Sequence, residues 1–129
     1  MEYDVSIWVK KAENDWKVVK MIVKNDYEPT DICCYHCHQV AEKYLKGYIT
    51  FQDREIIKSH NLPKLCRIIM EVDSRFFEII SLLEQLDNYG VSVKYPGDFA
   101  FPEKEESNHA VEITKQVRKF CRKALKLKT

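Results

Sequence analysis

The stretch that decides the fold is DICCYHCHQVAEKYLKGYITF, residues 31–51, because a helix separates its side chains into two faces. At about 100° per residue, the apolar and sulfur-bearing side chains gather on one side. They are Cys33, Cys34, Cys37, Ala41, Tyr44, Leu45 and Tyr48. The other side carries a polar stripe, which consists of His36, Gln39, Glu42, Lys43 and Lys46. The pattern predicts a helix that buries one face in the core.

Four further amphipathic segments accompany this one, and together they define the fold class. Apolar residues recur at three- and four-residue steps over residues 4–24, 62–72, 75–88 and 103–126. Residues 89–102 form the long irregular connection. We expect Thr30 or Asp31 to cap the second helix, and Ser59 or Asn61 the third. Short connections favour antiparallel neighbours. The sequence therefore predicts an all-α, up-and-down antiparallel bundle of about five helices, with residues 1–129 as one domain.

Size and composition agree with a small globular domain in a reducing compartment. The chain has 129 residues, of which 45% are hydrophobic and 32% charged, so it can fold without a disulfide or metal. Its five cysteines show no secreted spacing pattern, and no apolar run reaches the ~20 residues of a membrane span. We expect a cytoplasmic protein with free thiols, no membrane association and no cofactor.

The densest group of metal-ligand residue types is the run of cysteines and histidines at positions 33–38. Residues four apart on a helix can share a metal, but a tetrahedral site needs two ligands from elsewhere. Cys66 or Cys121 could supply them, although both fit apolar stripes. The pattern favours core cysteines, and no metal site is predicted.

The formal net charge of +1 hides an uneven distribution. After Glu112 there is no acidic residue. The seven residues that follow with positive charge are Lys115, Arg118, Lys119, Arg122, Lys123, Lys126 and Lys128. Complementing the helix dipole and aiding solubility are sufficient reasons for this charge. Binding RNA or an acidic partner is the alternative.

Residues 34–47, CYHCHQVAEKYLKG, resemble the signature helix of HEPN domains. Two other segments are similar to family elements in the same order along the chain. They are the Ser-His-Asn-Leu of residues 59–62 and the Lys-Tyr-Pro-Gly-Asp of residues 94–98. The opening helix also resembles the family pattern at Trp8, Ala12 and Asp15.

The resemblance implies a helical bundle that forms homodimers and often pairs with a small nucleotidyltransferase in toxin–antitoxin or defence-type systems. It also implies two possible modes of action. Some members are metal-independent ribonucleases, which use an arginine followed four to six residues later by a histidine, with two copies meeting across a dimer. Others are binding modules without activity.

Arg54 and His60 match the spacing of the catalytic pair, since five residues lie between them. They lie between the second and third helices, whereas catalytic members place the pair near the start of a later helix. At that later position the chain has Lys104 and His109, and lysine does not reproduce the two-pronged contact of arginine with phosphate. We therefore favour a non-catalytic binding module, with a metal-independent ribonuclease using Arg54 and His60 as the alternative.

The polar stripe supplies the other candidate site. Gln39, Glu42, Lys43 and Lys46, together with Lys94, are predicted to bind a nucleotide, RNA or a partner protein. The competing interpretation is a solvated helix face with local Glu–Lys pairs, which stabilise a helix by only a few tenths of a kcal/mol.

Overall fold

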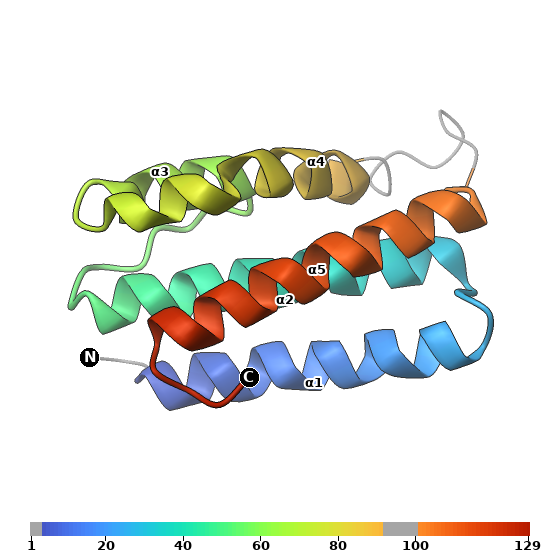
Figure 1. Ribbon diagram of the computed structural model, residues 1–129, viewed down its shortest axis with the longest axis horizontal. Helices are drawn as coiled ribbons and strands as arrows, with labels where there is room; N and C mark the ends of the chain where they lie inside the picture. Colours follow the sequence, from blue (N-terminus) through green and yellow to red (C-terminus); the bar gives the residue numbers. More distant parts are fainter. Residues whose placement is uncertain (1–3, 92–100) are drawn as a thin grey trace.

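The computed structural model describes residues 4–91 and 101–129 (Figure 1). The helices are α1 (Val5–Lys24), α2 (Thr30–Phe51), α3 (Leu62–Met70), the 3₁₀ helix η1 (Ser74–Ile79), α4 (Ile80–Val91) and α5 (Lys104–Ala124). No strand occurs within the described ranges. The predicted all-α bundle is confirmed, with helices whose bounds lie close to those expected.

Local sequence signals explain most helix starts. Asp4 caps α1, since its carboxylate accepts a hydrogen bond from the Ile7 amide at 3.1 Å. Asn61 caps α3 by accepting one from the Lys64 amide at 2.9 Å, as expected. At α5 a capping box joins Glu103 and Glu106. Each cap satisfies a backbone N–H that the helix itself leaves without a partner.

Two details of the sequence prediction were wrong. Neither Thr30 nor Asp31 caps α2, because Pro29 occupies the cap position without a side-chain hydrogen bond. Its fixed φ supplies the extended entry to the helix, so Thr30 is already the first helical residue. The segment predicted as one helix over 75–88 divides into η1, which Asp73 caps through the Arg75 amide, and α4, which extends to Val91.

Helix α2 lies at the centre of the bundle. Helix α1 packs along one side of it, α5 along another, and α3 with α4 along a third (Figure 1). The close approach of α1 depends on Gly47, where an added Cβ would lie only 3.1 Å from Cβ of Trp8. Most of α2 is buried as a result, including residues that the sequence pattern placed on its polar stripe.

The link between α2 and α3 is a second reason for that burial. Residues 52–61 turn back at the end of α2 (Figure 1). His60 therefore lies beside Glu42, which is more than two helical turns before the end of α2. Glu42 and Lys46 are only 4% and 7% exposed. The interpretation of this stripe as a solvated face is therefore wrong for Glu42 and Lys46, because the periodicity of one helix does not show what folds over it.

Candidate functional site

A histidine at the surface and a carboxylate beneath it form the centre of the candidate site. His60 Nδ1 lies 3.0 Å from both Oε1 and Oε2 of Glu42. The side chain of His60 is 72% exposed, whereas that of Glu42 is 6% exposed. Because a carboxylate only accepts, His60 donates through Nδ1–H, and its Nε2 is the nitrogen left for other partners. The imidazole is thus held in one tautomer.

Lys46 supports the Glu42 carboxylate from within the same helix. Its Nζ donates to Glu42 Oε2 at 2.9 Å, one turn along α2, and both side chains are buried. Burying two charges costs several kcal/mol each, which their attraction offsets only when the geometry is good and further hydrogen bonds exist. The contact to His60 supplies such a bond. Lys46 therefore positions Glu42 rather than facing solvent.

A second histidine extends the network toward α4. His38 Nε2 lies 3.0 Å from Asp87 Oδ1, and its Nδ1 lies 3.8 Å from Glu42 Oε1. Asp87 also accepts a hydrogen bond from the Leu62 amide at 3.1 Å, at the start of α3. Sequence reasoning considered His38 only as a metal ligand, and it missed Asp87. The four-residue step from His38 to Glu42 places both on one side of α2 and could have indicated their contact. Asp87 is distant in the chain, and nothing in the sequence indicates that it joins them.

Arg54 and His60 are directed to opposite ends of α3. The Arg54 guanidinium donates to the Ile68 carbonyl at 2.6 Å and to Glu71 at 2.6 Å, so it binds the C-terminal end of that helix. His60 precedes its N-terminal end. A nine-residue helix is about 13 Å long. Their spacing in sequence therefore does not join them at one site within a single chain.

The remaining members of the polar stripe connect α2 to α1. Lys43 Nζ donates to Asp15 Oδ2 at 2.5 Å, and His36 Nδ1 lies 2.8 Å from Asp15 Oδ1. Gln39 is partly exposed between these contacts and Glu42. Lys94, also predicted to bind a ligand, lies outside the described residues.

On the other side of α2, Tyr44 belongs to a separate polar cluster. Its hydroxyl donates to Glu13 at 2.5 Å and accepts from Arg122 at 2.9 Å. Burial and the hydrogen bond to Glu13 raise the pKa of Tyr44 to about 12. Arg118 donates two hydrogen bonds to Glu13, at 2.8 and 2.7 Å, and its guanidinium lies 5.6 Å from the Trp16 ring centre. This cluster joins α5 to α1.

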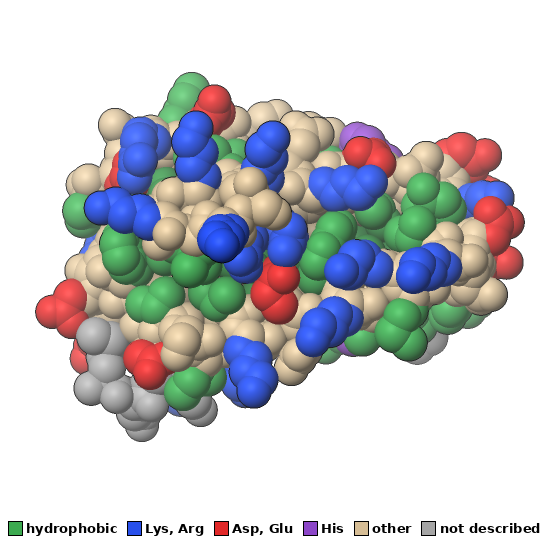
Figure 2. Space-filling view, turned by 60° about the horizontal axis from the view of Figure 1, so that its bottom comes forward, with side chains coloured by type: hydrophobic (Ala, Val, Ile, Leu, Met, Phe, Trp, Pro, Cys, Tyr) green, Lys and Arg blue, Asp and Glu red, His purple; other side chains and the backbone are tan. Residues whose placement is uncertain are grey.

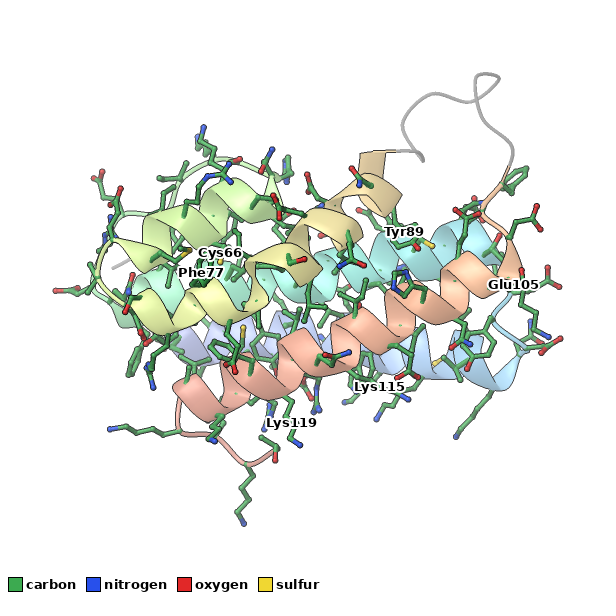
Figure 3. The ribbon with its side chains drawn as sticks, turned by 45° about the horizontal axis from the view of Figure 1, so that its top comes forward. Cys66, Phe77, Tyr89, Glu105, Lys115 and Lys119 are labelled. Atoms are coloured by element: carbon green, nitrogen blue, oxygen red, sulfur yellow. The ribbon has the colours of Figure 1, made fainter. Side chains whose placement is uncertain are left out.

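The alternative pair, Lys104 and His109, lies near the start of α5. Lys104 Nζ binds Asp26 Oδ1 at 2.5 Å, while His109 Nδ1 lies 2.7 Å from the Tyr89 hydroxyl. An open hollow at this end is lined by Tyr27, Lys104, Glu105 and Asn108. Figure 3 shows Tyr89 and Glu105 at this end of the bundle. His109 and His60 thus present two separate surfaces of the domain.

The five cysteines are all free and buried. Among the described residues, no group of three His, Cys, Asp or Glu side chains is arranged to hold a metal ion. The described helices also include none that is long and apolar enough to cross a membrane.

A central helix, wrapped by four others and carrying a polar network that reaches the surface at His60, defines an all-α module. The chain belongs to the HEPN family, since the HEPN domain model matches residues 5–124. The resemblance seen in residues 34–47 is confirmed by that match.

Known proteins of similar sequence or fold agree with this assignment. A Methanocaldococcus jannaschii protein that is provisionally named a toxin is 26% identical over 91% of this chain and 78% of its own length. An archaeal HEPN homologue, ST0689, has a TM-score of 0.74 at 19% identity, covering 95% of this chain and 98% of its own. TT1696 from Thermus thermophilus has a TM-score of 0.78 at 16% identity, covering 92% and 96%. At these identities the two structures show the fold alone.

Proposed function

We propose that this chain is the HEPN module of a toxin–antitoxin or defence-type system and that it works as a homodimer. In this proposal it binds a partner nucleotidyltransferase, and it binds a nucleotide or RNA through the surface around His60. Membership of the HEPN family and the similarity to a provisionally named toxin support the system type. The His60 surface supports the binding role.

The observation that carries the proposal is the fixed orientation of an exposed imidazole. An exposed histidine normally samples several rotamers, and ordering it costs entropy. Here a buried carboxylate, itself held by Lys46, keeps the His60 ring in place with Nε2 free of the Glu42 contact. A pre-oriented polar group binds a ligand with less loss of entropy. Gln39, one turn before Glu42 and partly exposed, is placed to add a second contact.

A second candidate function is metal-independent RNA cleavage, and the same geometry favours it. A carboxylate that holds the Nδ1–H of histidine leaves Nε2 able to accept a proton, which a general base requires. Arg54 of the same chain is occupied at the far end of α3. In this alternative the cation for the transition state would come from Arg54 of the second copy in a dimer, and that Arg54 would have to release its own contacts with Ile68 and Glu71.

One assay separates these functions. The purified protein, verified as a dimer by sedimentation, is incubated with single-stranded RNA and a chelator. Binding without cleavage supports the module. Cleavage that disappears in His60→Ala, with the helical circular dichroism spectrum intact, supports the ribonuclease. His109→Ala is the matched control, because it removes an exposed imidazole from the other candidate surface. A protein that neither binds nor cleaves RNA or nucleotides contradicts both.

A further inference from the structure

The charges of this chain are strongly separated in space, although they nearly cancel in total. Helix α1 and residues 113–129 together hold twelve basic and two acidic residues, whereas the rest of the chain holds nine basic and eighteen acidic. The two acids are Glu13 and Asp15, and both are already bound to cations of the domain, Arg118 and Lys43. Helix α1 and residues 113–129 therefore carry the excess positive charge of the chain, and the remaining residues carry an excess of negative charge.

This positive charge is organised in two rows that flank the seam between α1 and α5. Figure 2 shows that side of the molecule, where Lys and Arg side chains spread across the middle and acidic side chains lie mostly toward the ends. Figure 3 shows Lys115 and Lys119 on one edge of α5. The exposed lysines that flank the seam, here called the lysine face, are Lys10, Lys17, Lys20, Lys24, Lys115 and Lys119.

The hydrogen bonds of the seam fix how the two rows face one another. Glu13 of α1 binds Arg118 and Tyr44 at the bottom of the seam, so α1 and α5 are held side by side. On α1, Lys17, Lys20 and Lys24 follow at steps of three and four residues, which places the Cβ atoms of neighbouring lysines about 5–6 Å apart on one face. Lys115 has one weak partner, Glu112, at 3.3 Å between two half-exposed side chains. The lysines form extended rows rather than a single pocket.

We infer that the lysine face binds the phosphate backbone of RNA. Rows of lysines that neutralise successive phosphates release counterions, which supplies most of the affinity in binding without sequence preference. An acidic protein partner fits less well, because lysine is depleted from protein–protein interfaces. The inference relies on the proposed function only for RNA as the ligand class. It concerns another surface, since Tyr44 faces the seam while Glu42, two residues earlier in α2, faces His60.

The test compares two triple variants with the same change in net charge. Lys17→Gln, Lys20→Gln and Lys24→Gln neutralise one row of the lysine face. Lys58→Gln, Lys64→Gln and Arg67→Gln neutralise three exposed cations of the link and α3. Both triples are made in the His60→Ala background, so that the outcome does not depend on the proposed ligand contact of His60. Affinity for a single-stranded RNA of about a dozen nucleotides is measured at several salt concentrations.

We expect the α1 triple to weaken RNA binding by at least about tenfold at low salt and to reduce the salt slope by about two, as three lost phosphate contacts require. The α3 triple lies beside the His60 surface rather than the seam, and it should weaken the binding clearly less than the α1 triple does. Equal weakening by both triples would show that net charge alone matters and would overturn the inference. If polyglutamate bound more tightly than RNA and the α1 triple lost this binding, the ligand of the lysine face would be an acidic protein, and the inference of RNA would be overturned. DNA of the same sequence bound more than tenfold more tightly would also overturn the assignment to RNA.

Discussion

His60 Nδ1 lies within 3.0 Å of both carboxylate oxygens of Glu42, although the two residues belong to different segments of the chain. The contact exists because the link after α2 returns along that helix. It connects an exposed ring to a buried ion pair, since Glu42 also binds Lys46. The orientation of the surface group is therefore coupled to the stability of the interior.

Removing the Glu42 carboxylate should destabilise the domain strongly. In Glu42→Ala the Lys46 ammonium stays buried without its partner, and a broken buried pair typically costs about 3–5 kcal/mol. Urea unfolding followed by circular dichroism measures the loss. Replacing both residues, as Glu42→Leu with Lys46→Met, should recover most of it, because an apolar pair of similar volume leaves no buried charge. A single variant that loses less than about 1 kcal/mol would contradict the buried pair.

A larger residue at position 47 should separate α1 from α2. The Cβ of Gly47→Val would approach Trp8 Cβ at about 3.1 Å, and overpacking of this kind costs about 1–3 kcal/mol. Thermal unfolding measures the change, and Gly47→Ala should lose less. Combining Gly47→Val with Trp8→Gly should be less than additive, because glycine at position 8 lacks the Cβ atom that the new side chain would meet. If the two changes in stability were fully additive, the contact between positions 8 and 47 would not be the source of the strain.

Glu13 should make the fold sensitive to acid. Burial raises the pKa of its carboxyl, but the hydrogen bonds from Arg118 and Tyr44 outweigh that effect, so the folded pKa is lowered. Because its pKa is lower in the folded state, Glu13 stabilises the fold at pH values above about 4.3, which is the pKa of a glutamate in the unfolded chain. This contribution is lost as the pH falls below about 4.3 and through the folded pKa.

Glu13→Gln should therefore lower the free energy of unfolding by about 1–2 kcal/mol at neutral pH, and the difference from wild type should shrink below about pH 4. Chemical denaturation at a series of pH values measures both effects. Glu112→Gln is the control, because its exposed pair with Lys115 should contribute little. If the difference in free energy of unfolding between Glu13→Gln and the wild type stayed constant with pH, the lowered pKa of Glu13 would be contradicted.

The thiols should behave as core residues without a metal. Burial raises the pKa of Cys66 to about 12 and that of Cys121 further still, so both remain protonated. A hydrogen bond with Cys37 lowers the pKa of Cys33, but this thiol too is fully buried. We expect all five to react with a thiol reagent only as the domain opens, and a chelator to leave the melting temperature unchanged. A chelator-induced drop would indicate a bound metal.

The sequence predicted the fold well because apolar residues recur at helical spacing in each segment and several helices carry local caps. Residues 31–51 mark α2 clearly, and Asn61 marks the start of α3. The cap of α2 was mispredicted because two suitable side chains follow Pro29, whose own extended backbone already starts the helix. Residue patterns within each segment therefore predict where the helices are, but they predict the first residue of a helix poorly where several neighbouring residues could act as its cap.

The candidate site could be predicted only in part. His60 and Glu42 were both singled out, but for different reasons, and nothing local indicates that a link would bring them together. Asp87 comes from α4 and joins the site because α4 packs against α2 and against the start of α3. Arg54 shows the opposite case, because a spacing that suits catalysis proves compatible with capping the end of α3. Long-range contacts therefore decide which polar residues share a site.

The central claim is that His60, held by Glu42, is the residue that meets a nucleotide or RNA. The most direct measurement is an NMR titration of the histidine ring signals of the wild-type protein with a 5′-phosphorylated RNA dinucleotide, which is too short to span the lysine face. We predict that the His60 signals shift while those of His109 do not, and that His60→Ala weakens the binding at least about tenfold. Shifts confined to His109, or equal affinity in His60→Ala, would contradict the account.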